Sequence, residues 1–512
     1  MKLIKSLILG SSAGLIAMSG AQAADLPVKA KAIEYVKVCS LYGAGFWYIP
    51  GTDTCIRIGG AIRIDTALNG GIYDNPFWQG GAGSTKAYGK NWYTGRSRFN
   101  LTEDTRTATE YGVLRTYANV QMDWTSNGGS AIAGGAPVEV DYAFIQFAGF
   151  TIGKAVSEFD PQWALAKPTI TSGMWAGSND ATGINQLAYT ATFGNGVSGT
   201  IAIEDGQPYR TAGVVNTSAA SLNLLVQNSP TAGALNYGVG GFTGNAVAGD
   251  HVPDIVGNLR LDQAWGSLHF AAAGHEVHGN YYGADSSTGH PGSTWGYAVS
   301  GAFELKNLFT GPGDSLKVEA SWAHGAAKYV WGGTLDTSGA GRMFAANNTA
   351  PGGTVGFGYV LDGVYSGTNA VNGTSISLSN AWEVSAFYEH YWNPAWRTSI
   401  FGNYSSISYG SGNAALVAAL GSAAQNTNGV FLINNGTADM TTAQVGTKTS
   451  WTPVKDLTIS GEFLYSRLMP KATGTFVNGP TSPILSGGPV GGVYTIGAQN
   501  VYNGAVQILR SF

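Results

Sequence analysis

Hydrophobic and polar residues alternate in many short segments of this chain. In segment 295–306, large apolar side chains occupy every second position except Gly301, and small or charged residues occupy the positions between them. The apolar set is Trp295, Tyr297, Val299, Phe303 and Leu305. Because successive side chains of a strand point to opposite faces, this pattern predicts a β-strand with one apolar and one polar face. Segments 314–325 and 55–68 repeat the pattern.

The same pattern divides the chain into about sixteen predicted strands. They are 55–68, 91–103, 110–123, 137–148, 150–159, 185–194, 197–205, 254–263, 266–276, 295–306, 314–325, 380–391, 395–408, 441–452, 456–468 and 501–512. Alternate connections are short: 104–109, 194–196, 307–313 and 453–455. Others are long and rich in Gly, Ala, Ser and Asn: 206–253, 326–379, 409–440 and 469–500. Tight turns on one side and long loops on the other are typical of a transmembrane antiparallel β-barrel.

Composition supports a membrane barrel over other classes. Charged residues make up 11% of the chain, against about 25% in an ordinary soluble protein. A hydrophobic content of 44% argues against disorder, and a net charge of −4 offers no basic surface for nucleic acid. After Ala23 no apolar run is long enough for a spanning helix, so a spanning chain must close a barrel. Aromatic residues near predicted strand ends, such as Trp124, Trp322 and Trp451, fit the girdles of such barrels.

The first residues form a predicted export signal. Lys2 and Lys5 precede an apolar stretch, and Ala21-Gln22-Ala23 matches a small-x-small cleavage site. We therefore expect residues 1–23 to be a signal peptide and residues 24–512 to form one barrel domain. The sequence leaves open whether residues 24–54 form a periplasmic segment or part of a plug.

Three segments resemble the alphaproteobacterial outer-membrane porin family of rhizobial and Brucella type. They are Val38–Gly60 (VCSLYGAGFWYIPGTDTCIRIGG), Asp141–Lys154 (DYAFIQFAGFTIGK) and the C-terminal strand that ends in Phe512. The resemblance implies a homotrimeric, sixteen-stranded, water-filled channel for small hydrophilic solutes and ions. It also implies a bacterial outer-membrane location, with lipid and lipopolysaccharide around the barrel.

The two cysteines are Cys39 and Cys55. In an exported chain with an even number of cysteines, a disulfide is the expected state. Closing a loop of this size would stabilise the protein by about 3 kcal/mol in the chain-entropy model. No histidine lies nearby in the sequence, so we expect a structural staple and no metal site there.

The third predicted loop, 158–185, is the candidate pore constriction. It contains Trp163, Leu165, Pro168, Ile170, Met174 and Trp175. Six such residues gain nothing in water, so we expect the loop to fold into the barrel and pack on its wall. Its acidic residues are Glu158, Asp160 and Asp180, and the expected lumen bases are Arg57, Arg63, Arg96, Arg98 and Arg115. Opposed charges would tune ion preference; alternatively, these arginines are solvated lumen residues paired with neighbours such as Asp65.

Sequence signals for catalysis are weak. His275 and His278 are three residues apart, and on a strand they would point to opposite faces and could not share a metal. Gly10-Ser-Ser-Ala-Gly14 matches a nucleophile-elbow pattern but lies in the predicted signal peptide. We therefore expect no enzyme, no cofactor and no metal. A passive channel is the leading hypothesis, with a substrate-specific channel and a secreted β-rich adhesin as alternatives.

Overall fold

The computed structural model describes most of the chain. The described residues are 37–69, 88, 92–126, 138–170, 174–179, 182–206, 212–218, 223–227, 242–243, 247–249, 251–332, 342–422, 429–482, 485 and 487–512. The predicted signal peptide, residues 1–23, therefore lies outside the described residues.

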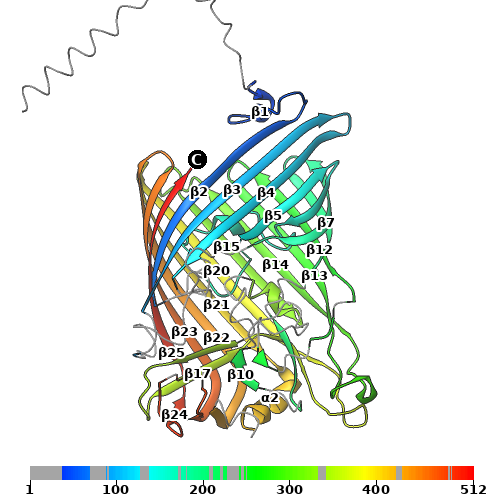
Figure 1. Cartoon of the computed structure of the whole chain (residues 1–512), viewed down its shortest axis with the longest axis vertical. Helices are drawn as coiled ribbons and strands as arrows, with labels where there is room; N and C mark the ends of the chain where they lie inside the picture. Colours follow the sequence, from blue (N-terminus) through cyan, green and yellow to red (C-terminus); the bar gives the residue numbers. More distant parts are fainter. Residues whose placement is uncertain are drawn as a thin grey trace, which may run out of the picture.

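A closed barrel of sixteen antiparallel strands forms the body of the molecule (Figure 1). The barrel strands are β2 (Cys55–Leu68), β3 (Tyr93–Thr109), β4 (Gly112–Thr125), β5 (Val138–Phe147), β6 (Phe150–Ala155), β7 (Ile184–Gly194), β8 (Val197–Glu204), β12 (Asp254–Gln263), β13 (Gly266–Val277), β14 (Thr294–Lys306), β15 (Ser315–His324), β20 (Asn380–Asn393), β21 (Trp396–Ser408), β22 (Gly429–Val454), β23 (Leu457–Asn478) and β25 (Gln499–Ser511). The last strand pairs with the first, from Ala61 with Ser511 to Leu68 with Gly504. Each predicted segment overlaps one of these strands, although some bounds differ, such as the end of β6 at Ala155. The overlap confirms the predicted all-β barrel.

The two faces of each strand differ as the alternation predicted. On β2, Ile58, Ile62 and Ile64 are exposed on the outside, while Asp65 faces the interior and is 1% exposed. Trp124, Trp322 and Trp451 are exposed near strand ends, and the Trp451 ring stacks on that of Trp396. The outer surface is therefore an apolar band bordered by aromatic rings, as a lipid-facing barrel requires.

One end of the barrel, here called the turn end, is made of short connections. At Asn195–Gly196 both residues have positive φ, the geometry of a two-residue hairpin turn. The predicted connection 104–109 is wrong, because β3 continues to Thr109, which pairs with Gly112. Those residues are polar because they line the interior, where Asp104 receives hydrogen bonds from Arg106 and Arg115.

The opposite end, here called the loop end, carries secondary structure that the sequence did not predict. Strands β22 and β23 extend well past the predicted 441–452 and 456–468 and pair as far as Gly429 with Asn478. The additional elements are β9 (Gly213–Asn216), β10 (Asn223–Gln227), β11 (Phe242–Thr243), η4 (Ser286–Thr288), β16 (Arg342–Ala346), β17 (Thr354–Tyr359), β18 (Leu361–Tyr365), β19 (Ser377–Leu378), η6 (Gly410–Gly412), α2 (Asn413–Leu420) and β24 (Val493–Ile496).

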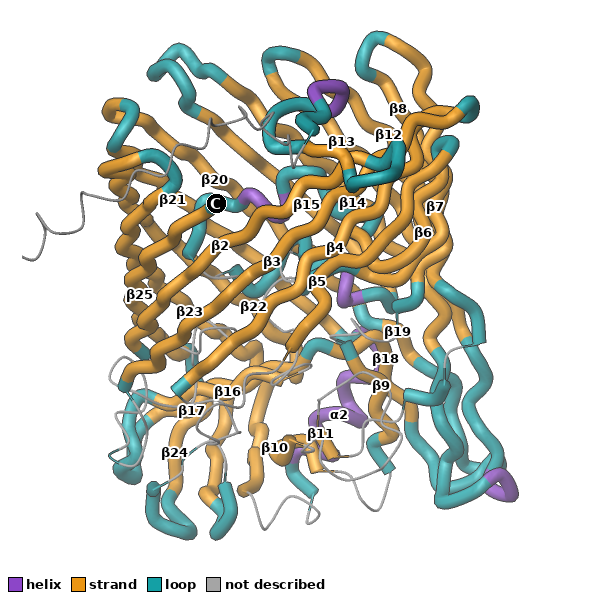
Figure 2. The backbone as a smooth tube through the Cα atoms, turned by 45° about the horizontal axis from the view of Figure 1, so that its top comes forward, coloured by secondary structure: helices purple, strands orange, loops and turns teal. Residues whose placement is uncertain are grey.

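Residues of β9, β16, β17, β18, β24 and α2 share one apolar cluster at the loop end (Figure 2). β17 pairs with β16 and β24, and β18 pairs with β9 and β19, so segments far apart in sequence form joint sheets. Phe357, Tyr359 and Leu416 are fully buried among them. The long loops therefore form a cap with an apolar core, because their aliphatic and aromatic side chains gain by leaving water.

Among the residues that the structure describes, helices are few and short. The described part of the chain contains no helix that is long and apolar enough to cross a membrane.

Residues 37–54 lie at the turn end (Figure 1). Strand β1 (Trp47–Tyr48) pairs with β2, and the short helix η1 (Ser40–Tyr42) precedes it. A disulfide joins Cys39 to Cys55, and both cysteines are buried beside Phe46. The predicted staple is thus present and ties this segment to the first barrel strand.

Removing the disulfide should destabilise the barrel. The double variant Cys39→Ser/Cys55→Ser should lose about 3 kcal/mol of unfolding free energy, because the unfolded chain is no longer cross-linked. Guanidinium unfolding in detergent measures the loss, with Ser40→Ala as the control from the same segment. An unchanged midpoint in the double variant would contradict this prediction.

Candidate functional site

The third loop connects β6 to β7, and its described residues, 156–170, 174–179 and 182–183, lie inside the barrel. Trp163, Ile170, Met174 and Trp175 are each at most 5% exposed. Trp163 and Met174 pack in a cluster with side chains of the barrel wall: Ala302, Phe387, Phe401 and Leu464. Leu165 differs from the expectation, since it is 46% exposed. The predicted inward fold of this loop is confirmed.

Acidic and amide side chains of the wall hold the loop backbone. The backbone N–H groups of Glu158, Ile170, Trp175 and Ser178 are donors in four such bonds. Their acceptors are Glu204 (2.8 Å), Glu462 (2.6 Å), Gln444 (2.8 Å) and Glu319 (3.2 Å), respectively. A buried loop must find such partners, because an unpaired backbone group away from water is costly.

Basic and hydroxyl groups bind the loop carbonyls. Lys317 donates to Ala166 O at 3.0 Å, and Ser399 donates to Pro168 O at 2.9 Å. Arg63 donates to Ile170 O. Within the loop, Lys167 Nζ donates to Ser178 O at 2.6 Å and lies 3.5 Å from Glu319 on the wall. The loop is therefore held by strands on several sides of the barrel.

A second segment also enters the barrel, and the alternation pattern did not predict it. The start of the loop after β15 contains η5 (Ala327–Tyr329), and Trp331 forms a parallel bridge with Gly177 of the third loop. The Tyr329 ring lies 4.5 Å from that of Phe159, and Lys328 Nζ lies 3.1 Å from Asp254. The sequence did contain a signal for this burial, the apolar run Tyr329-Val330-Trp331. It lies in a predicted loop that is otherwise rich in small residues.

The predicted bases lie on the interior face of β2, β3 and β4 in two groups. Near the turn end, Asp104 is shared by Arg57 at 3.6 Å, Arg106 at 2.9 Å and Arg115 at 3.0 Å. Arg57 is the most open of these, with a side chain 48% exposed.

The second group lies further from the turn end, where Arg63 binds the carbonyl of Ile170 in the third loop. Asp65 receives Arg63 at 2.9 Å and Arg96 at 2.6 Å. Asp123 accepts two hydrogen bonds from Arg98, both 2.7 Å long. All five predicted arginines therefore pair with neighbouring carboxylates, and Arg63 also contacts the third loop.

Two of the predicted acids, Glu158 and Asp160, lie near the start of the third loop. Glu158 accepts a hydrogen bond from Asn258 at 2.9 Å, and Asp160 accepts one from the N–H of Asn179 at 3.1 Å. Burial raises the pKa of the Glu158 carboxyl group, and it raises the pKa of Asp160 to about 8. Asp180 lies outside the described residues.

Glu158 and Asp160 border a cavity of about 650 Å³. Asn258, Arg260 and His269 line the same cavity. Arg260 lies outside the predicted set of bases, although strict alternation on β12 places it on the same face as Asn258. Acidic and basic side chains thus line one cavity here.

Cutting one anchor should loosen the third loop. Glu462→Leu removes the acceptor for the Ile170 N–H at similar side-chain size, and a bond to a charged group contributes about 1.5–3 kcal/mol. We expect larger current fluctuations in single-channel recordings and faster proteolysis within the loop. Glu389→Leu is the matched control, because Glu389 pairs with Arg397 on the wall. Equal fluctuations in both variants would contradict the anchoring role.

Comparison with known proteins places this barrel in a family. The sequence model of the porin subfamily matches residues 25–485. The chain is 32% identical over 274 residues to Porin Omp2b of Brucella suis, and equally to that of Brucella abortus. Those alignments cover 52% of this chain and 64% of the relatives, so the matched part spans less than two thirds of their length.

A solved structure shares the fold. The outer membrane channel DcaP of Acinetobacter baumannii aligns over 91% of this chain and 99% of its own, with a TM-score of 0.52 and 12% identity. At that identity the likeness concerns the fold alone. The family match over most of the chain, together with the closed barrel, shows that the chain belongs to the porin subfamily and lies in the outer membrane.

Proposed function

We propose that this chain is a general diffusion channel, which lets small hydrophilic solutes and ions cross the outer membrane down their gradients. The observation that carries the proposal is a closed barrel with an apolar exterior, a charged interior and a third loop anchored inside it. Its turn end faces the periplasm and its loop end faces the exterior. Family membership favours a channel over an enzyme.

Charge along the path is proposed to set ion preference. The basic side is the interior wall that bears Arg57, Arg63, Arg96, Arg98 and Arg115, and the acidic side is the third loop with Glu158, Asp160 and Asp180. Two unit charges ~4 Å apart in water interact with an energy of about 1 kcal/mol, which changes the local ion occupancy by a factor of about five. Even partly compensated charges therefore suffice to tune conduction.

A substrate-specific channel is the second candidate, and one observation favours it. The segment around Trp331 enters the barrel beside the third loop, and the cap gathers at the loop end. We propose that both features narrow the route for solutes. A narrow route lined by defined side chains would bind its substrate. The third alternative, a secreted adhesin, is disfavoured because such a protein has no need for an apolar exterior.

The assembly is also part of the proposal. We propose a homotrimer, with outer-membrane lipid and lipopolysaccharide around the exposed aromatic and aliphatic band. We further propose that residues 1–23 are cleaved during export.

Planar bilayer recordings test the function directly. The refolded protein should give large steps that are linear in voltage, and steps that close in threes would report the trimer. A specific channel would instead show current that saturates and is blocked by its substrate. If samples with the heat-dependent gel migration of a folded barrel gave no conductance, the channel proposal would fail.

Ion preference should depend on pH through Asp160. Because the pKa of its carboxyl group is raised to about 8, Asp160 is mostly neutral at pH 6 and becomes negative as the pH rises past 8. The reversal potential in a salt gradient should therefore shift toward cations between pH 6 and pH 9.

The variant Asp160→Asn should lose a measurable part of that shift, whereas Glu389→Gln should keep it. A shift of the same size in Asp160→Asn and in the unmodified protein would assign the effect to other groups.

A further inference from the structure

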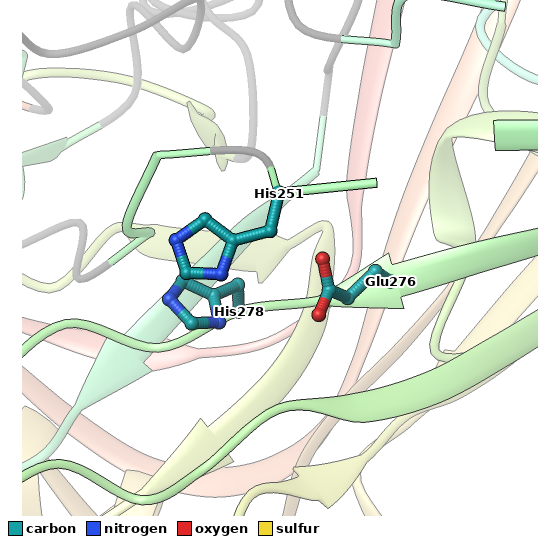
Figure 3. A group of neighbouring side chains, drawn as sticks. All are labelled: His251, Glu276 and His278. Atoms are coloured by element: carbon teal, nitrogen blue, oxygen red, sulfur yellow. The ribbon is translucent and has the colours of Figure 1, made fainter. Parts of the chain in front are cut away.

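A group of metal-binding side chains lies at the loop end, where β13 leaves the barrel. His251, Glu276 and His278 converge there (Figure 3). One potential ligand atom from each residue lies within 4.8 Å of the others. The imidazole rings of His251 and His278 are 4.0 Å apart between centroids.

The backbone explains why these three residues meet. Glu276 and His278 are two residues apart at the end of β13, so their side chains leave the same face. That face is the outer one, which also carries Phe270. His251 precedes β12, the antiparallel neighbour of β13, and Ala248 N donates to His278 O at 2.9 Å.

Glu276 supplies an independent sign of a ligand. Its Oε2 atom is buried and accepts no hydrogen bond in the described part of the chain. A buried carboxylate oxygen without a partner is costly, and a cation at this position would remove the cost. Ser293 Oγ lies 2.6 Å from Nδ1 of His278, a contact that orients this ring.

The adjacent His275 has a different role. It faces the interior, where its Nδ1 lies 2.7 Å from Asp254 and its Nε2 lies 3.5 Å from Asp362. His275 and His278 therefore point to opposite faces, as the sequence analysis expected. The group on the outer face comes instead from Glu276-x-His278 and a histidine from the preceding loop.

We propose that His251, Glu276 and His278 bind one divalent transition metal ion per chain, of the class of Zn²⁺. Two imidazoles and one carboxylate are a common ligand set for Zn²⁺, with water in the fourth position. Ligand atoms around such an ion are about 3.3 Å apart for bonds of about 2.0 Å, and a small rotation of the exposed His251 supplies the difference. The ion fastens the end of the preceding loop to β13, outside the conduction path.

Calorimetric titration of the untagged, folded protein with ZnCl₂ tests the site after treatment with a chelator. At pH 7.5 the protein should bind one Zn²⁺ per chain, and binding should weaken as the pH is lowered, because protons compete with the metal ion for its ligands. His251→Ala, Glu276→Gln and His278→Ala should each weaken binding at least about tenfold, since even outer-shell partners contribute that much.

His290→Ala is the matched control, because His290 is exposed in the neighbouring loop and lies outside the group. It should bind Zn²⁺ as the unmodified protein does. If His278→Ala does not fold, the exposed His251 still carries the test. The proposal is overturned if the unmodified protein binds less than one Zn²⁺ per chain. It is also overturned if His251→Ala binds normally, or if His290→Ala is weakened equally.

Discussion

The backbone of a membrane-spanning chain must satisfy its hydrogen bonds internally, because the hydrocarbon offers no partner. A β-sheet satisfies this condition only when its two edge strands pair with each other. Here the pairing of β2 with β25 removes both edges, and the lipid band, the lumen and the two ends follow from that closure. Once the sheet is closed, alternation divides every strand into a lipid face and an interior face.

The same constraint governs what can lie inside the barrel. The third loop leaves the sheet, so its N–H and C=O groups need other partners. The wall supplies them through side chains, with Glu204, Glu319 and Glu462 accepting bonds and Lys317 donating one. Charged interior residues therefore serve two purposes, since they hold the loop and they line the space next to it. A substitution in the lumen wall will often change loop position together with local charge.

Local patterns in the sequence predicted the barrel well, because every strand carries its own alternation. They also predicted the inward third loop, since Trp163 and Trp175 have no reason to face water. Predictions of turns from the polar composition of a segment were less accurate. Residues 104–109 look like a polar turn, yet they continue β3 along the interior face.

Contacts between distant loops could not be predicted from sequence alone. The bridge from Gly177 to Trp331 and the pairing of β18 with β9 join segments that are more than a hundred residues apart. No local period marks such partners. The interior facing of Arg260 could be predicted, because alternation on β12 gives its face. Its nearness to Glu158 could not be predicted, because it depends on the path of the third loop.

The ion pairs on the interior wall do not cancel the charge expected there. A pair between one arginine and one aspartate would leave little field, and that was the alternative role considered for the arginines. Asp104, however, is shared by Arg57, Arg106 and Arg115, so three cations face one anion. Around Asp65, by contrast, Arg63, Arg96 and Arg98 meet a second carboxylate, Asp123, so the positive charge there is largely compensated. Neighbouring carboxylates thus fix the orientation of the guanidinium groups, and the surplus of cations at Asp104 leaves positive charge near the turn end. Structural pairing and a role in ion preference are therefore compatible in the same residues.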